Sequence, residues 1–184
     1  MSHYDDNYIA KTIADFKRNM LTYEGERVIY FDADNTLYLF STYGQEQEAL
    51  AACRTKGFFK NLPVFQEAPH VIAALQNMGV KCKVLTALVN SPFCNEEKLS
   101  SLHYYFPTLQ DEDIITVPYG ESKVDKVKDV EHSILVDDYH GNINDWYNKK
   151  GVAIKKSYSG KPRPVPVVSN LVELFPVLKH LNFI

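Results

Sequence analysis

The chain has 184 residues, of which 45% are hydrophobic and 23% charged, and these values are typical of one globular domain with a buried core. The 20 basic and 23 acidic residues leave a net charge of −3, so we expect no basic face for a nucleic-acid polymer. No apolar run approaches the roughly 18 residues of a membrane span, and no secretory signal is recognised. Because Cys53, Cys82 and Cys94 form no CxxC pair, we expect neither disulfides nor a zinc site. These observations together predict a reduced, cytoplasmic protein.

The first predicted elements are a helix and a strand. Four apolar residues recur with helical spacing: Ile9, Ile13, Phe16 and Met20. They predict an amphipathic helix over 6–20. Gly25 interrupts this pattern before an apolar run over 27–31, which suits a buried strand. We therefore expect an N-terminal helical extension over 1–26, followed by the first strand of a sheet.

Strand-like and helix-like stretches alternate along the rest of the chain. Further strand-like runs lie at 83–86, 114–117, 133–136 and 152–154. Helix-like stretches lie at 66–78, 95–105, 122–130 and 142–149, and a last helix is expected after Ser169, which would cap it. This alternation predicts an α/β, three-layer αβα fold with a central parallel sheet. The apolar strands indicate that helices cover both faces of that sheet.

One interval is too long for a simple crossover between strands. We interpret residues 38–64 as an insertion after the first strand, with a helical stretch from Gln45 to Arg54. Residues 158–166, which contain one glycine and three prolines, are expected to form an exposed loop. The core would then consist of 27–37 and 65–184.

Polar residues follow the predicted strands where each one ends. They are Asp32, Asp34 and Thr36 after the first strand, Thr86 in the second, Lys123 after the third, and Asp137 and Asp138 after the fourth. Taken singly, each has an ordinary structural explanation as a turn, a strand end or a solvated helix face. The carboxyl ends of parallel strands form the usual ligand site of such sheets. Because crowded carboxylates repel one another unless a cation joins them, the set predicts a cation site.

The order Asp-x-Asp-x-Thr, Thr, Lys and Asp-Asp resembles the haloacid dehalogenase (HAD) superfamily of phosphatases over roughly 27–156. Within it, the chain is similar to bacterial and phage members of the 5′(3′)-deoxyribonucleotidase group. That similarity is carried by residues 56–63, Ala68, Ala73, Ala74, 134–138, 142–146 and 151–154. The resemblance implies a HAD-like Rossmannoid core in which 38–64 form a small cap over the site.

The resemblance also implies Mg²⁺-dependent hydrolysis of a phosphomonoester through an aspartyl-phosphate. Asp32 would attack phosphorus, and Asp34 would protonate the leaving oxygen and later activate water. Mg²⁺ would be held by Asp32, the main-chain carbonyl of Asp34 and Asp138. Asp137 would be a further ligand or would contact one.

Binding of the phosphate is expected to involve residues from three strand ends. Thr86 would donate a hydrogen bond to a phosphate oxygen, and Lys123 would neutralise charge on the phosphoryl group. Lys126 competes for the lysine role, and we favour Lys123 because it begins its predicted helix. Thr36 and Asn35 lie in a loop whose amides would also hold the phosphate.

Substrate choice is expected to depend on aromatic residues of the cap. Phe58 and Phe59 are candidates for stacking on a nucleobase, although they would equally form a small cap core; Phe40 and Tyr43 are further candidates. The chain departs from the animal deoxyribonucleotidases in its short cap, in Thr36 and in Ala87. The expected substrate is a small phosphate ester, a nucleoside monophosphate first, with a sugar or other metabolite phosphate as the alternative.

Two other classes of protein share parts of this pattern. A phospho-receiver domain also uses an acidic pair, an aspartate, a threonine and a lysine on a parallel sheet. Its acidic pair follows the first strand, whereas here Asp32 and Asp34 come first and the pair Asp137 and Asp138 comes late. A binding module without catalysis would not need the complete set of reactive groups. We therefore expect an enzyme.

Overall fold

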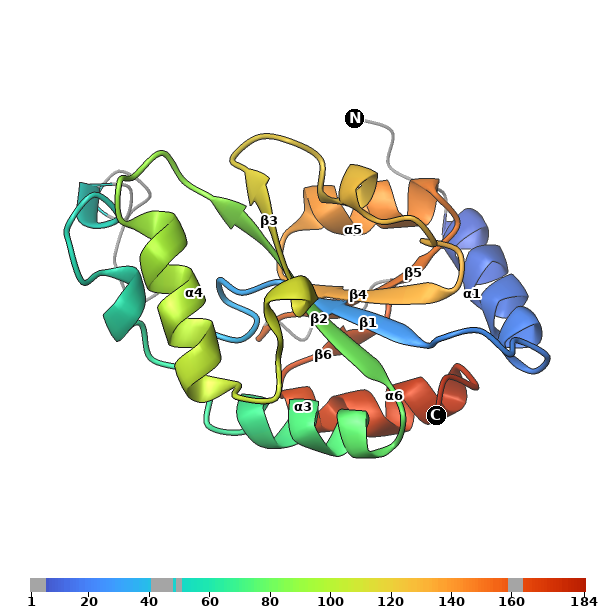
Figure 1. Ribbon diagram of the computed structural model, residues 1–184. Coiled ribbons are helices and arrows are strands. Elements are labelled where there is room, and N and C mark those ends of the chain that lie inside the picture. Colours follow the sequence, from blue (N-terminus) through green and yellow to red (C-terminus); the bar gives the residue numbers. More distant parts are fainter. Residues whose placement is uncertain (1–5, 41–47, 49–50, 159–163) are drawn as a thin grey trace.

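The fold is a three-layer αβα sandwich around one parallel sheet (Figure 1). The computed structural model describes residues 6–40, 48, 51–158 and 164–184. The strands are β1 (Val28–Phe31), β2 (Lys81–Leu88), β3 (Ile114–Pro118), β4 (Ser133–Asp137), β5 (Val152–Lys156) and β6 (Val167–Val168). The α-helices are α1 (Asp6–Met20), α3 (Ala68–Asn77), α4 (Cys94–Tyr105), α5 (His140–Asn148) and α6 (Leu174–His180). This confirms the predicted α/β class with its parallel sheet.

The strand order is β3-β2-β1-β4-β5-β6, with every neighbouring pair parallel. The chain therefore leaves β1 towards β2 on one side and returns to pair β4 on the other. In open parallel sheets, such a reversal opens a crevice at the carboxyl ends of the two strands involved. We call the position beyond the carboxyl ends of β1 and β4, where Phe31 pairs with Val136, the crevice. The predicted acidic residues follow directly.

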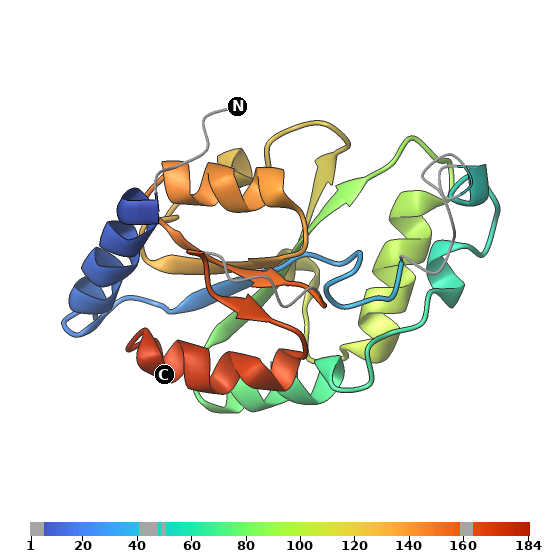
Figure 2. The same cartoon turned by 180° about the vertical axis from the view of Figure 1, so that it is seen from behind.

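Both faces of the sheet are buried by helices. Alternate residues of the central strands point to opposite faces, so Phe31 packs with α3 and α6 while Leu135 packs with α5. Trp146 and Tyr147 of α5 are fully buried against the strands. Figures 1 and 2 show α5 on one side of the sheet and the pair α3 and α6 on the other. The structure thus confirms the prediction, made from the apolar strands, that helices cover both faces of the sheet.

The two ends of the sheet are occupied differently. α1 lies at the amino end of β1, while α4 and the segment 51–62 lie at the carboxyl ends (Figures 1 and 2). The ends of the predicted insertion are paired, because the Leu39 amide donates to the Pro63 carbonyl at 2.8 Å. We call residues 38–64 the cap segment. Tyr43 and half of the helix expected from Gln45 to Arg54 lie outside the described residues, and the domain boundaries stay a prediction.

The prediction of a helix over 122–130 is wrong. Only a single 3₁₀ turn, η3 (Lys123–Lys126), forms there. Ser122 does not cap it, because its hydroxyl donates instead to Asp145 of α5 at 3.1 Å. Val124 and Val130 are buried in the hydrophobic cluster that contains the α5 residues. β-branched residues such as valine also have a lower helix propensity than most residues.

The C-terminal helix also starts differently from the prediction. Asn170, not Ser169, provides the cap, since its side chain accepts a hydrogen bond from the Val172 amide at 2.8 Å. The capped element is the 3₁₀ turn η4 (Leu171–Glu173), and α6 follows it. Pro176 lies in the first turn of α6, where a missing amide costs no helix hydrogen bond. No helix among the described residues is both long and apolar enough to cross a membrane.

Candidate active site

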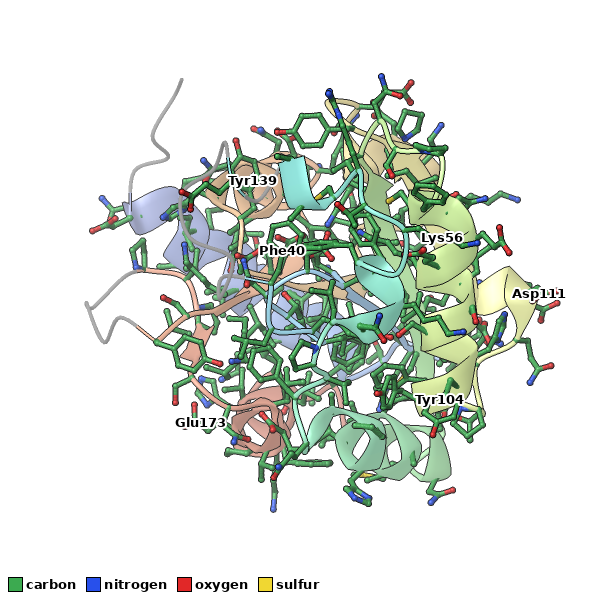
Figure 3. All side chains as sticks on the ribbon, turned by 90° about the vertical axis from the view of Figure 1, so that its left-hand side faces the viewer. Phe40, Lys56, Tyr104, Asp111, Tyr139 and Glu173 are labelled. Carbon is green, nitrogen blue, oxygen red and sulfur yellow. The ribbon has the colours of Figure 1, made fainter. Side chains whose placement is uncertain are left out.

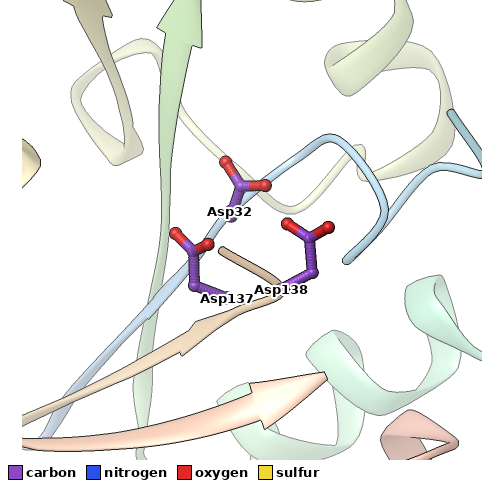
Figure 4. Close-up of side chains that lie close together, drawn as sticks. All are labelled: Asp32, Asp137 and Asp138. Carbon is purple, nitrogen blue, oxygen red and sulfur yellow. The ribbon is translucent and has the colours of Figure 1, made fainter. Parts of the chain in front are cut away.

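Three carboxylates meet at the crevice between β1 and β4. Asp32 directly follows β1, Asp137 ends β4, and Asp138 is the next residue. The Asp32 amide donates to the Val136 carbonyl at 2.9 Å, so the pairing of the strands fixes Asp32 beside Asp137. One oxygen atom from each carboxylate lies within 4.8 Å of the others (Figure 4). The structure therefore brings together the carboxylates of three of the four aspartates that the sequence pattern selected.

A buried lysine joins two of these carboxylates. The Lys123 ammonium forms a short contact with Asp32 and a 2.8 Å hydrogen bond with Asp137. Asp137 also accepts hydrogen bonds from the Asn142 side chain and the Tyr139 amide, both at 2.8 Å. These contacts hold Asp137 firmly, whereas Asp32 keeps a carboxylate oxygen for other partners.

The competing lysine lies away from the carboxylates. The Lys126 ammonium is 3.6 Å from Glu121, and 42% of its side chain is exposed. The geometry thus brings Lys123 and not Lys126 to the crevice. A substrate-binding role for Lys126 has no support from its position.

Burial and like charge disturb the acidity of the site. Burial raises the pKa of Asp32 to about 8 against the opposing effect of Lys123, with Asp137, Asp34 and Asp138 adding to the increase. Burial and then Asp137 raise the pKa of Asp138 to about 6. Burial and neighbouring carboxylates together disfavour the ionised forms of Asp32 and Asp138 more than the Lys123 ammonium favours them.

These oxygens suit a hard divalent cation. Mg²⁺ prefers carboxylate oxygen and water, and a divalent charge would stabilise Asp32 and Asp138 in their ionised forms. The donor set contains no nitrogen or sulfur ligand, which makes zinc or a softer metal a poorer match. The residues present therefore fit Mg²⁺.

The loop after β1 turns sharply because of Asn35. This residue has φ of 60°, a left-handed conformation that asparagine tolerates better than most residues. The Leu37 and Tyr38 amides both donate to the Ala33 carbonyl at 2.9 Å, and the Asn35 side chain accepts from the Phe40 amide at 3.1 Å. The turn carries Asp34 across the crevice towards α4.

A second buried lysine, absent from the sequence prediction, meets Asp34. The Lys98 ammonium donates to Asp34 at 2.6 Å, to the Thr86 hydroxyl at 3.0 Å and to the Ala87 carbonyl at 2.9 Å. Lys98 comes from the middle of α4 and follows no strand, so the strand-end pattern could not select it. One signal was available in the sequence: Lys98 is spaced by four residues from Cys94 and from Leu102, so the three share one face of a helix. That face is buried, where a lysine is unusual.

The other predicted substrate contacts are more deeply buried than a binding surface would require. Thr36 has no exposed surface, and its hydroxyl has no hydrogen-bond partner among the described residues. Phe58 and Phe59 are 8% and 1% exposed and pack edge to face with centroids 5.0 Å apart. Phe40 contacts Phe58 in the same way. These rings are continuous with the main hydrophobic core beneath the sheet, and their contact with a base stays a prediction.

A cavity of about 150 Å³ lies at the carboxyl ends of β2 and β3. Its lining residues come from the cap segment and from the loops after β2 and β3: Cys53, Arg54, Val89, Asn90 and Tyr119. Burial raises the pKa of the Cys53 thiol to about 11, with the Asp34 carboxylate as the next cause. Figure 3 looks onto this end of the molecule, where Phe40 lies between Tyr139 and Lys56 in the view.

Comparison with known proteins gives structural matches only. No protein-family model matches the chain, and no curated protein sequence matches it. A HAD family hydrolase from Deinococcus radiodurans R1, solved with phosphate and sodium, is similar with a TM-score of 0.56 and 12% identity over 85% of this chain and 96% of that one. The D,D-heptose 1,7-bisphosphate phosphatase from B. bronchiseptica, complexed with magnesium and phosphate, gives 0.54 and 11% over 84% and 98%.

A third match is an enzyme of a different reaction class. The L-2-haloacid dehalogenase from Xanthobacter autotrophicus, solved with chloropropionic acid covalently bound, has a TM-score of 0.57 and 10% identity over 85% of this chain and 99% of that one. The chain therefore has the HAD-like Rossmannoid fold. Since phosphatases and a dehalogenase share that fold, the reaction must be argued from the site. A receiver domain is disfavoured as well, because its sheet follows the order 2-1-3-4-5.

Proposed function

We propose that the chain is a Mg²⁺-dependent phosphomonoester hydrolase. The observation that carries this proposal is the buried contact of Lys123 with Asp32 and Asp137, beside Asp138, at the reversal point of the sheet. A carboxylate that attacks a phosphate dianion needs positive charge on both sides of the transferred group. The ammonium supplies one such charge, and the carboxylates suit a cation that supplies the other.

In the first step, an Asp32 oxygen bonds to phosphorus while the bond from phosphorus to the ester oxygen breaks. The released oxygen takes a proton from Asp34, so the alcohol leaves and the phosphoryl group remains on Asp32 as an aspartyl-phosphate. Lys98 holds one oxygen of Asp34 and so orients the carboxyl group, while Oδ1 has no partner among the described residues. Thr86 would orient the phosphate.

In the second step, a water molecule attacks phosphorus and its proton passes to Asp34. The bond between phosphorus and Asp32 breaks, which releases inorganic phosphate and restores both carboxyl groups. Asp32 and Asp138, with the main-chain carbonyl of Asp34, would hold Mg²⁺. Bound Mg²⁺ supplies charge stabilisation of the phosphoryl oxygens in both steps.

The leaving group would occupy the cavity lined by Arg54, Asn90 and Tyr119. Its volume of about 150 Å³ is well below the roughly 300–1,000 Å³ of sites that hold drug-sized ligands. This size favours the second candidate, a sugar or other small metabolite phosphate, over a complete nucleoside monophosphate. Arg54 would provide a hydrogen-bond donor to hydroxyl or anionic groups of the leaving group.

The test is a phosphate-release screen across nucleoside monophosphates and sugar phosphates, with Mg²⁺ and with EDTA. We expect turnover that EDTA abolishes and Mg²⁺ restores. Turnover of sugar phosphates alone would reject the nucleotidase prediction and keep the hydrolase. Indifference to chelation would remove the role of the metal, and no release from any ester would reject the proposed function.

A further inference from the structure

One turn of α4 holds the cap segment through a buried carboxylate. Glu97 is 8% exposed, and its two oxygens accept hydrogen bonds from three main-chain amides of the cap segment. The Gly57 amide lies at 2.5 Å, the Phe59 amide at 3.1 Å and the Lys60 amide at 3.4 Å. A buried carboxylate is costly without such donors, and these three replace the water that it loses.

The backbone of the cap segment is shaped to present these amides. Gly57 has φ of +90°, which a residue with a side chain rarely adopts. The Asn61 side chain donates to the Gly57 carbonyl at 2.7 Å, and the Phe58 amide donates to the Thr55 carbonyl at 3.2 Å. The turn is therefore closed on itself and points its remaining amides at Glu97.

The next residue of α4, Lys98, contacts the side chains of the crevice. Lys98 contacts Asp34 and Thr86, as described above, and its ammonium lies 5.1 Å from the centroid of the Phe59 ring. Phe59 thus covers the ammonium from the cap side and excludes water from its contact with Asp34. The ring stays there because Glu97 binds the amide of the same residue.

We propose that Glu97 is a positioning residue that couples the cap segment to the Asp34 side chain. Two consecutive residues of α4 bind the two partners: Glu97 fixes the turn that carries Phe59, and Lys98 fixes Asp34 beneath that ring. Displacement of the turn hydrates the Lys98 ammonium and releases Asp34 from a single orientation. The inference rests on the proposed function for the role of Asp34, while the anchoring of the cap segment does not.

The test compares Glu97→Gln with Glu96→Gln, whose side chain is exposed on the same turn of α4. Glu97→Gln keeps the size of the side chain but loses a charged acceptor and points N–H groups towards amide donors. We expect kcat to fall about tenfold to a hundredfold with a much smaller change in KM. Hydrogen exchange at the amides of 57–60 should accelerate in this variant alone, and Glu97→Asp should recover part of kcat.

Phe59→Leu tests the same link without altering Glu97. It leaves the three amide hydrogen bonds in place and removes the ring above Lys98, so we expect kcat to fall while amide exchange at 57–60 stays slow. If Glu97→Gln accelerates exchange but leaves kcat unchanged, the coupling to Asp34 is wrong. If exchange is unchanged, the anchoring itself is wrong. A wild-type chain inactive on every ester would reject the hydrolase, and the exchange result would still decide the anchoring.

Discussion

The two sides of the crevice are built in different ways. The core half, comprising Asp32, Lys123, Asp137 and Asp138, comes from residues at or just after strand ends. The cap half, comprising Asp34, Thr86, Lys98 and Phe59, is assembled from a turn, a strand, a helix and the cap segment. Each half contains one buried lysine that binds aspartate.

The two halves are held in place by different kinds of contact. Strand pairing fixes the core half, because the Asp32 amide bonds to β4 and the Asp137 carboxylate accepts three hydrogen bonds. The cap half depends on side chains that meet across separate elements, and 26% of the Asp34 side chain is exposed. We expect disruption of the core half to affect stability and chemistry together, and disruption of the cap half to affect mainly chemistry.

The largest effect is expected from Asp32→Asn in the core half. The amide keeps the shape of the carboxylate but cannot form the aspartyl-phosphate. Phosphate release from an aryl phosphate should therefore fall by on the order of 10⁴-fold or more. A thermal melt should show an intact fold. Full activity of this variant would remove Asp32 as the nucleophile.

Lys123→Met is expected to damage the core half in both respects. It leaves Asp32 and Asp137 buried without their cation, so the free energy of unfolding without Mg²⁺ should fall by about 3–5 kcal/mol. The kcat should fall by about 10²–10³-fold. Urea titration and initial rates measure the two effects, and added Mg²⁺ should recover part of the stability.

Lys126→Met is the matched control for that variant. Its side chain is partly exposed and pairs with Glu121, so stability should stay within about 0.5 kcal/mol of wild type. A loss equal to that of Lys123→Met would mean that the sequence-based choice between the two lysines was wrong.

Lys98→Met is expected to separate chemistry from stability in the cap half. Methionine fills much of the space of the lysine stem, and the partly exposed Asp34 can hydrate, so unfolding should change less than in Lys123→Met. The kcat should fall by about a hundredfold, because Asp34 loses its fixed orientation. Lys149→Met, at the exposed end of α5, provides a control, and an equal kcat in both variants would contradict the role of Lys98.

The smallest expected effect is a pH dependence of Mg²⁺ binding that belongs to the core half. Without metal, the pKa values of Asp32 and Asp138 are raised to about 8 and about 6, and bound Mg²⁺ requires both groups ionised. Affinity should therefore weaken as pH falls from about 8, at most about tenfold per pH unit for each proton displaced. Calorimetric titration across this range measures it.

Two variants sharpen this last expectation. Asp138→Asn should remove the part of the pH dependence near pH 6. Lys98→Met should leave the pH dependence unchanged, because Lys98 does not contact the three carboxylates. A pH-independent affinity in the wild-type chain would contradict a metal held by Asp32 and Asp138.

The sequence predicts the core half well because its residues follow apolar strands. Once the sheet is parallel, Asp32 and Asp137 lie at the same edge, and the pairing of β1 with β4 then brings them together. Lys98 could not be found this way, because its place depends on how α4 docks against the crevice. The helix expected over 122–130 failed for a related reason: Ser122 bonds to Asp145 of α5, a contact between distant residues. The strand β6 was missed because two residues carry too little pattern.

Under the proposed function, the register of β1 against β4 would make activity a reporter of correct folding. Val28 pairs with Ser133 and Phe31 with Val136, and successive side chains of a strand point to opposite faces. A slip by one residue would therefore send Asp32 and Asp137 into different layers, where Lys123 could not bridge them. Refolding experiments can exploit this: regain of phosphate release would time the moment when these two strands settle into their native alignment, separately from the recovery of helical structure.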